Sequence, residues 1–279
     1  MSRAVYQLLC SDVDGTLLNK QGEISEANRA AAGAAIRAGK KIVLCSGRTW
    51  HSLKFYEETL GLSMAGQYGI GFNGGVVYEI LAGGKTKLLM NDLMPAAIAQ
   101  EIFAALAPRI AAYDEMHMLA YNNEGLLIAE EALQESRLFD EMVKLGAHVT
   151  PSYAQLPGDM YKILVHGKHA ELREIEAFTS SYFAGKCQSM FSAESLLELI
   201  PMGVDKGRGV RFLARHLGIP IGEVIAMGDE ANDIAMLQAA GLGVAVANAV
   251  PAAIAAADVH INAGCNDSAL AVVINDYLL

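Results

Sequence analysis

Two acidic residues follow an apolar run near the start of the chain. Residues 8–18 read LLCSDVDGTLL, so Asp12 and Asp14 stand one residue apart directly after a segment typical of a buried strand. Neighbouring carboxylates repel each other, and without a cation one of them is expected to hold its proton. Mg²⁺, which takes oxygen ligands and often uses one or two carboxylates, fits this pattern. A simple polar turn is the alternative, whereas an EF-hand loop is excluded because Thr16 and Leu17 occupy the places of its next ligand and glycine.

Two further segments carry groups that suit an anion. The segment CSGRT places Ser46 and Gly47 between a strand and a helix N-terminus, where backbone N–H groups favour negative charge. The segment GVDKG places Lys206 just ahead of another helix. Both features also have an ordinary interpretation, because Ser46 could cap a helix and a lysine at a helix start is usually solvated.

The densest group of acids lies in the segment MGDEANDIAML, residues 227–237. It follows an apolar strand, and so much negative charge at a strand end is unfavourable without a cation. A solvated acidic helix start, which the helix dipole favours, is the competing interpretation. The residues of interest in this segment are Gly228, Asp229, Glu230, Asn232 and Asp233.

The elements that would position these residues alternate between strands and helices. Apolar runs predict strands and apolar periodicity predicts helices, in a β-α-β-α order that indicates a parallel sheet. We expect the two ends of the chain to share this sheet and its ligands to bind beyond the carboxyl ends of the strands. The predicted strands are 6–10, 41–45, 224–228 and 242–248, and the predicted helices are 25–40, 48–62, 206–218 and 232–241.

The central part of the chain has a different pattern and predicts an inserted domain. Strands such as 160–167 and 196–201 alternate there with long helical patterns over 95–107, 131–146 and 169–185. The predicted fold class is therefore α/β, with a Rossmann-like parallel sheet as the core and an α+β domain inserted into it. The expected ranges are 1–82 and 201–279 for the core and 83–200 for the insert, with hinges near Gly83 and Pro201.

Composition limits the class of function. The chain has 279 residues, a formal net charge of −10 at pH 7 and 53% hydrophobic residues, which indicates a folded protein of about two domains. The acidic balance, without a cluster of lysine and arginine, argues against nucleic acid or an anionic membrane surface as partner and favours a small molecule. The oligomeric state, monomer or homodimer, stays open.

The sequence also bears on location and redox state. The apolar stretch at the start is too short for a signal peptide, and no window reaches the ~18 apolar residues of a spanning helix, so we expect a cytoplasmic protein. The four cysteines are far apart and form no CxxC pair, which predicts buried thiols and neither a zinc site nor disulfides.

Taken together, the segments DVDGT, SGR, DK and GDEAND resemble in this order the motifs of the haloacid dehalogenase superfamily. The resemblance is specific to its Cof-like phosphatases, which carry a large α/β cap (type C2B) after the second motif. The segments FNGG at 72–75, LELIPMGVDKG at 197–207 and VANA at 246–249 match as well, so the resemblance spans nearly the whole chain. It implies a Mg²⁺-dependent hydrolase of phosphate monoesters.

The resemblance also implies a role for each motif residue. Asp12 would be the nucleophile that forms an aspartyl phosphate, and Asp14 would protonate the leaving alcohol and then activate water. Mg²⁺ would be held by Asp12, by the backbone carbonyl of Asp14 and by Asp229, with Asp233 near or behind these ligands. The phosphoryl oxygens would be bound by Val13, Ser46, Gly47, Lys206 and Asn232.

Substrate choice is the least determined property. Asn73 in the segment FNGGVVY suits a type I′ hairpin turn and a substrate contact equally well. In the insert, Lys162 is the first candidate for contact with the leaving group. We expect a phosphatase of a small phosphorylated metabolite such as a sugar phosphate. The alternatives are a phosphomutase with the same nucleophile and a non-catalytic sensor of phosphorylated metabolites.

Overall fold

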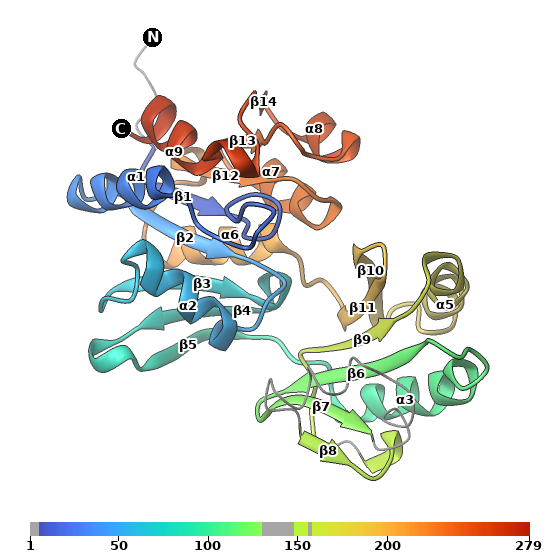
Figure 1. Cartoon of the computed structure of the whole chain (residues 1–279). Helices are drawn as coiled ribbons and strands as arrows, with labels where there is room; N and C mark the ends of the chain where they lie inside the picture. The colour runs from blue at the N-terminus through green and yellow to red at the C-terminus, as the bar shows by residue number, and fades with distance from the viewer. Residues whose placement is uncertain (1–5, 130–147, 156–157) are drawn as a thin grey trace. The chain divides into compact units, whose positions relative to one another are not determined.

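The computed structural model describes residues 6–129, 148–155 and 158–279 (Figure 1). The chain divides into two compact units, of which the first combines Met1–Asn91 with Val204–Leu279 and the second is Asp92–Gly203. Each unit has its own hydrophobic core. The helix predicted over 131–146 lies outside the described residues.

The first unit is built on an eight-stranded sheet. Its strands are β1 (Leu8–Ser11), β2 (Lys41–Cys45), β3 (Gln67–Gly71), β4 (Val76–Ile80), β5 (Thr86–Asn91), β12 (Val224–Gly228), β13 (Leu242–Ala245) and β14 (Val259–His260). Their order is β14-β13-β12-β1-β2-β3-β4-β5. The six strands from β14 to β3 are parallel, and β4 and β5 are each antiparallel to the preceding strand. Strands from both ends of the chain therefore share one sheet, as predicted.

Helices cover both faces of this sheet (Figure 1). In one group α1 packs against α2 and α9, and in the other α7 packs against α6 and α8. Because both faces are covered, the central strands are buried along their whole length and are apolar at nearly every position. The helices are α1 (Glu26–Arg37), α2 (Trp50–Leu60), α6 (Lys206–His216), α7 (Ile234–Ala239), α8 (Pro251–Ala256) and α9 (Ala269–Val273).

Short helical turns connect these elements. The 3-10 turns of the first unit are η1 (Phe72–Gly74), η2 (Ala82–Gly84), η5 (Ile221–Glu223), η6 (Ala231–Asp233) and η7 (Cys265–Asp267), and a π-helical turn, η8 (Ile274–Leu278), ends the chain. At the start of α1, the hydroxyl of Ser25 accepts a hydrogen bond from the amide of Asn28 at 3.2 Å. The sequence prediction of Ser25 as an N-cap is therefore confirmed.

The insert begins later than predicted. β5 follows the turn at Gly83 and pairs with β4 from Asn91 opposite Val76 to Thr86 opposite Ile80. The residues 83–91 are thus part of the core sheet, and the second unit runs from Asp92 to Gly203 instead of from 83 to 200. Gly83 consequently lies in a hairpin turn of the first unit and not at the boundary between the two units.

The second unit contains a six-stranded sheet with helices packed against it. Its strands are β6 (His117–Asn122), β7 (Gly125–Ala129), β8 (His148–Thr150), β9 (Lys162–His166), β10 (Cys187–Ala193) and β11 (Leu196–Pro201). Their order is β10-β11-β9-β6-β7-β8, and all neighbours are antiparallel except β7 and β8. The helical elements are α3 (Ala96–Ile110), α5 (His169–Tyr182) and the 3-10 turn η4 (Tyr153–Gln155). The unit is an α+β domain, as predicted.

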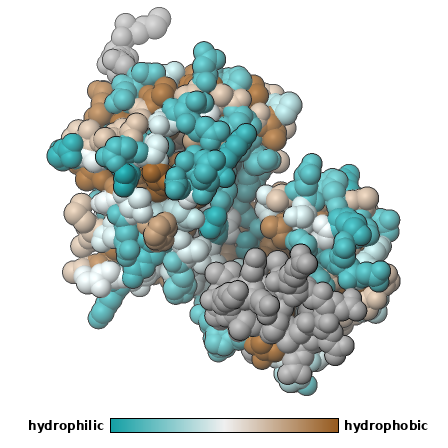
Figure 2. Space-filling model, in the orientation of Figure 1, coloured by the Kyte–Doolittle hydropathy of each residue, from teal (hydrophilic) through white to brown (hydrophobic). Residues whose placement is uncertain are grey.

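The surface and the buried thiols agree with a folded globular protein. Hydrophilic residues are interspersed with hydrophobic ones on the face drawn in Figure 2. All four cysteines are free and buried, as predicted. None of the helices in the described ranges has both the length and the apolar composition needed to cross a membrane.

Candidate active site

Three loops that carry the motif residues leave the sheet at neighbouring strand ends. β1 lies between β12 and β2, and all three strands are parallel, with Ser11 opposite Met227 on one side and Leu44 on the other. The chain continues from these ends into Asp12, into Ser46 and into Asp229. Because the carboxyl ends of parallel strands meet at one edge, the motifs come together there, as expected.

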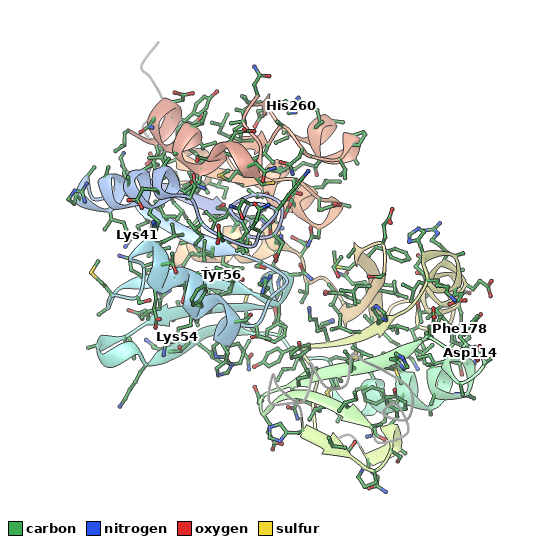
Figure 3. All side chains as sticks on the ribbon, in the orientation of Figure 1. Lys41, Lys54, Tyr56, Asp114, Phe178 and His260 are labelled. Atoms are coloured by element: carbon green, nitrogen blue, oxygen red, sulfur yellow. The ribbon has the colours of Figure 1, made fainter. Side chains whose placement is uncertain are left out.

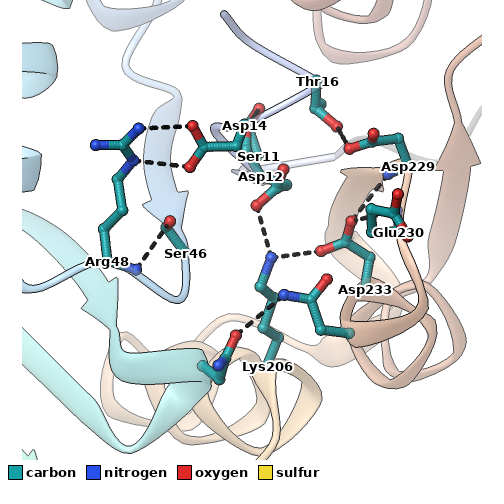
Figure 4. Close-up of polar contacts among 12 residues, drawn as sticks. Ser11, Asp12, Asp14, Thr16, Ser46, Arg48, Lys206, Asp229, Glu230 and Asp233 are labelled. Carbon is teal, nitrogen blue, oxygen red and sulfur yellow. Dashed lines mark hydrogen bonds and ion pairs between the residues drawn. The ribbon is translucent and has the colours of Figure 1, made fainter. Parts of the chain in front are cut away.

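Lys206 joins two of the carboxylates (Figure 4). Its Nζ donates to Asp12 Oδ1 at 2.6 Å and to Asp233 Oδ1 at 2.5 Å, and the side chain is only 1% exposed. Burial by itself lowers the pKa of Lys206, but the attraction of Asp12 and Asp233 outweighs it and raises that pKa above its ordinary value. Lys206 is the first residue of α6, whose N-cap is Asp205, and it is buried instead of solvated.

Three buried carboxylates surround this ammonium group. Oxygen atoms of Asp12, Asp229 and Asp233 all lie within 4.8 Å of one another. Burial, together with the charge of Asp233, raises the pKa of Asp12 well above its usual range, although Lys206 opposes the shift. Burial also raises the pKa of Asp229 to about 7, against the hydrogen bond from Thr16. One ammonium cannot balance three carboxylates, so this donor set fits a hard divalent cation such as Mg²⁺.

Hydrogen bonds from the backbone fix the acidic loop after β12. Asp233 Oδ2 accepts from the amides of Asp229 at 2.9 Å and Glu230 at 3.0 Å. Gly228 passes so close to this carboxyl group that a Cβ added to it would lie 2.5 Å from Asp233 Cγ. Since both oxygens of Asp233 are engaged by protein donors, its main role in this structure is to hold Lys206 and the loop in place.

Asp229 is held by the loop that follows β1. The hydroxyl of Thr16 donates to Asp229 Oδ1 at 2.7 Å. Gly15 has φ +78°, and a Cβ there would lie 2.2 Å from Asp229 Oδ2. From a third loop, Asn248 donates to the Gly15 carbonyl at 2.8 Å. Any side chain at Gly15 would push these two loops apart.

Asp14 stands outside the acidic cluster. Its side chain is 54% exposed, and both of its oxygens accept hydrogen bonds from Arg48, one from Nε at 2.7 Å and one from Nη2 at 2.7 Å (Figure 4). Among the described residues, the Asp14 side chain is not part of the group of possible metal ligands. The predicted role of the Asp14 backbone carbonyl as a metal ligand stays a prediction.

The predicted phosphate donors lie around the same strand ends. Among the described residues, the amide of Val13 has no hydrogen-bond acceptor, while its carbonyl accepts from two amides of the following turn. Ser46 is 2% exposed, and its hydroxyl oxygen accepts from the Arg48 amide at 3.2 Å, which leaves its own proton for another acceptor. Gly47 lies so near Asn73 that a Cβ there would be 3.0 Å from Asn73 Oδ1.

The structure bears on one of the two interpretations of Asn73 that the sequence left open. It has φ 54° and ψ 35° in the turn between the antiparallel strands β3 and β4, so a hairpin is confirmed, although its loop has four residues, 72–75. The side chain is nevertheless fully buried, and Asn73 Oδ1 accepts from Asn232 Nδ2 at 3.1 Å. This bond orients the Asn232 amide, a predicted phosphate donor, and contact of Asn73 with a substrate stays a prediction.

Lys162 belongs to the second unit, where it lies on β9. Its Nζ donates to Glu198 Oε1 of the adjacent strand β11 at 2.9 Å, and both side chains are buried. The ammonium group also lies 5.6 Å from the centre of the Tyr121 ring. Lys162 therefore has a structural partner in its own sheet, and a contact with substrate stays a prediction.

Three residues of this arrangement were missed by the sequence reasoning. Thr16 and Arg48 stand inside the segments DVDGT and SGR, and Asn248 stands inside VANA, but none of them received a role. A hydroxyl two residues after an acid, or an arginine after Ser-Gly, has many uses in proteins. Their partners become visible only once the loops are placed.

Comparisons with known proteins agree with this geometry. A family model described as haloacid dehalogenase-like hydrolase matches residues 9–274. The chain is 29% identical over 277 residues to the putative phosphatase YxeH of Bacillus subtilis, covering 99% of each protein. It is 28% identical over 248 residues to an HMP-PP phosphatase of Serratia proteamaculans, covering 88% of this chain and 86% of that one.

The fold has counterparts among solved structures. TM0651 from Thermotoga maritima matches with a TM-score of 0.79 and 26% identity over 97% of both chains. A haloacid dehalogenase-like hydrolase from Bacteroides thetaiotaomicron matches equally well, with a TM-score of 0.79 and 26% identity over 97% of this chain and 98% of that one. With the family model over nearly its whole length and the acidic site at the strand ends, the chain belongs to the haloacid dehalogenase-like hydrolases and is an enzyme of their phosphoric monoester hydrolase type.

Proposed function

We propose that this protein is a Mg²⁺-dependent phosphatase that hydrolyses a small phosphorylated metabolite through an aspartyl phosphate on Asp12. The observation that carries the proposal is the pairing of Lys206 with Asp12 and Asp233 beside a second buried acid, Asp229. This arrangement leaves one carboxylate oxygen of Asp12 available to attack a phosphate group, and the ammonium group of Lys206 supplies positive charge that attracts the phosphate. A merely structural ion pair would not require a third buried acid.

The metal would be held by Asp12, Asp229 and the backbone carbonyl of Asp14, with Asp233 behind them. When bound, Mg²⁺ supplies positive charge that lets an anionic nucleophile approach an anionic phosphate. Support for this assignment comes from the raised pKa of Asp12 and Asp229, which reflects burial and, for Asp12, the nearby charge of Asp233.

In the first chemical step, Asp12 attacks the phosphorus atom. Asp12 Oδ1 accepts from Lys206, and among the described residues its Oδ2 has no hydrogen bond, so that oxygen is available as the nucleophile. The bond from Oδ2 to phosphorus forms as the bond from phosphorus to the leaving oxygen breaks. A proton from Asp14 goes to that oxygen, which departs as an alcohol.

In the second step, the aspartyl phosphate is hydrolysed. Asp14, now ionised, takes a proton from a water molecule, and the water oxygen bonds to phosphorus while the bond to Asp12 breaks. Inorganic phosphate leaves and both carboxyl groups return to their starting forms. Donors that would face the phosphoryl oxygens through both steps are Val13, Ser46, Gly47, Lys206 and Asn232.

Two rival functions use the same site. A phosphomutase would return the phosphoryl group from Asp12 to a sugar and release little free phosphate. A non-catalytic sensor would bind phosphorylated metabolites without turnover. The sensor is disfavoured because the nucleophile, the acid and the lysine are all present and in contact with suitable partners.

The substrate class is proposed as a small phosphate ester, with sugar phosphates first. Relatives of this chain include HMP-PP phosphatases and a 5-amino-6-(5-phospho-D-ribitylamino)uracil phosphatase of Bacillus subtilis that is 26% identical over 255 residues. The substrates in these names differ in the group that is attached to the phosphate. This agrees with relatives that share one reaction and differ in the substrate that they select.

Phosphate release from a panel of phosphorylated metabolites, measured with Mg²⁺ and with chelator, tests the proposal. We expect Mg²⁺-dependent release of phosphate from at least one sugar phosphate and from p-nitrophenyl phosphate. Transfer of label to a sugar without free phosphate would establish the mutase instead. Binding of metabolites without any turnover would establish the sensor. As a matched control, Asp114→Asn changes an exposed acid of the second unit and should leave all rates unchanged.

A further inference from the structure

We infer that Arg48 is the positioning residue for Asp14 and that it serves mainly the hydrolysis of the phosphoenzyme. This inference rests on the proposed function and deepens it. The guanidinium donates to both oxygens of Asp14, with both distances at 2.7 Å. Such a fork holds a carboxylate in one plane and one orientation, which a single ammonium cannot do. Asp14 needs this support because its side chain is half exposed and has no other hydrogen-bond partner among the described residues.

Arg48 is itself fixed at three points. Its amide donates to Ser46 Oγ at 3.2 Å, and its carbonyl accepts from the Phe72 amide at 3.0 Å. Its guanidinium carbon lies 5.3 Å from the centre of the Tyr56 ring, within reach of a cation–π contact. Tyr56 projects from α2, labelled in Figure 3. The arginine thus connects the second motif and α2 to Asp14, across 34 residues of sequence.

The two chemical steps make different demands on this pair. To take a proton from water, Asp14 must be an oriented carboxylate, which is the form that Arg48 holds. To give a proton to the leaving oxygen, one Asp14 oxygen must carry hydrogen, and the neutral carboxyl group is then a weaker acceptor for the arginine N–H groups than the carboxylate. With p-nitrophenolate, a leaving group that needs little protonation, the first step should depend weakly on Arg48. The second step should depend on it strongly.

Rapid-quench kinetics with p-nitrophenyl phosphate separate these steps. For Arg48→Ala we expect a burst of p-nitrophenolate at close to the wild-type rate, followed by a steady state slowed about 10- to 100-fold, a part of what an oriented general base contributes. Arg48→Lys keeps the positive charge but loses the two-pronged hydrogen bond, so its steady-state rate should lie between those of the wild type and Arg48→Ala. Tyr56→Leu should show the same pattern more weakly. Arg29→Ala, which changes an exposed arginine of α1, is the matched control.

A double-mutant cycle shows whether Arg48 acts through Asp14. In an Asp14→Asn background, Arg48→Ala should slow the steady state by less than about 2-fold, because the group it positions is already disabled. Additive effects, or an equal fall of burst and steady-state rates in folded Arg48→Ala and Arg48→Lys, would overturn the inference. If the wild type itself forms no phosphoenzyme and releases no phosphate, it is the proposed function that fails.

Discussion

A single ammonium group among buried carboxylates defines the chemistry at the scale of residues. Lys206 pairs with Asp12 and Asp233, and Asp229 stands beside them without a cation of its own in the described part of the chain. Because buried like charges raise each other's pKa, folding of the metal-free protein works against full ionisation of this group. A bound cation should therefore stabilise the site, and replacing Asp12 or Asp229 by its amide should cost little stability in the metal-free protein.

Replacing Asp12 by Asn tests the nucleophile. The amide has nearly the same shape but is a poor nucleophile, so turnover should fall by at least about 10³-fold. The melting temperature in chelator should not fall, because the variant removes a carboxylate whose charged form is disfavoured by burial. Phosphate release and a thermal melt on the same sample measure both. Full activity in Asp12→Asn would disprove the mechanism.

Replacing Asp14 by Asn tests the acid and base. With p-nitrophenyl phosphate the phosphoenzyme should still form, since that leaving group needs little protonation, whereas its hydrolysis should slow by about 10² to 10⁴-fold. A burst of one p-nitrophenolate per active site, followed by slow turnover, is the expected trace. An unchanged steady-state rate would assign the acid and base role to another group.

At the scale of elements, α2 carries a buried carboxyl group, that of Glu57, which has no part in the proposed reaction. Glu57 on α2 is 2% exposed and accepts a hydrogen bond from the Tyr78 hydroxyl on β4. Burial raises the pKa of Glu57 to about 7, from an ordinary value of 4.5, with the Tyr78 bond opposing the shift. The same side chains line a cavity of about 530 Å³ between α2 and the hairpin of β4 and β5.

The pH dependence of stability should report this buried acid. Below pH 4.5 Glu57 is mostly protonated in both the folded and the unfolded state, so it does not lower the free energy of unfolding. Between pH 4.5 and 7 the unfolded chain loses the proton while the folded protein keeps it, so the free energy of unfolding falls by up to about 3 kcal/mol. Glu57→Gln should remove this fall and unfold at higher urea than wild type at pH 8, with little difference at pH 4.5. Parallel curves for both proteins across this range would contradict the assignment.

A second buried pair stabilises the sheet of the other unit. Lys162 on β9 and Glu198 on β11 are 6% and 3% exposed. Lys162→Met removes this buried ion pair and should destabilise the unit by about 3 to 5 kcal/mol, whereas Lys162→Met combined with Glu198→Met should restore most of the loss. Hydrogen exchange of the β9 and β11 amides in the full chain measures this.

The same two variants test the predicted substrate role of Lys162. If the lysine also contacts the leaving group, the double variant should stay folded but change the ranking of substrates in kcat/KM more than it changes p-nitrophenyl phosphate hydrolysis. An unchanged ranking in the folded double variant would limit Lys162 to its structural pairing.

At the scale of the whole molecule, metal binding should couple to stability. At 100 times its dissociation constant, a ligand of the folded state adds about 2.7 kcal/mol, which for a chain of this size raises the melting temperature by roughly 5 to 10 °C. We expect this shift when Mg²⁺ is added after EDTA, together with recovery of activity. Ca²⁺ should support activity poorly because it prefers more ligands at longer distances.

Variants of the acidic group provide the controls for the metal. Asp229→Asn should abolish the Mg²⁺-dependent shift in melting temperature, while the exposed Asp114→Asn should retain it. Activity that persists undiminished in EDTA, or an equal shift in Asp229→Asn, would place the metal elsewhere.

Much of this protein could be predicted from the sequence alone. The alternation of apolar runs and helical patterns determined a parallel sheet, and the carboxyl ends of its strands necessarily bring Asp12, Ser46 and Asp229 to one edge. Neither the order of the strands nor the side chains of the loops had to be known for that conclusion. The two cores and the buried cysteines follow equally from composition and pattern.

Only the tertiary structure decided how these residues are partnered. Lys206 meets Asp12 across 194 positions of sequence and Arg48 meets Asp14 across 34, and such contacts depend on loop geometry that periodicity does not encode. The start of the insert was misplaced for a similar reason, because the segment Thr86–Asn91 is largely exposed and shows no burial pattern, yet its backbone pairs with β4. Local pattern reports which residues are buried, whereas hydrogen bonding between distant segments decides where a domain ends and which charges meet.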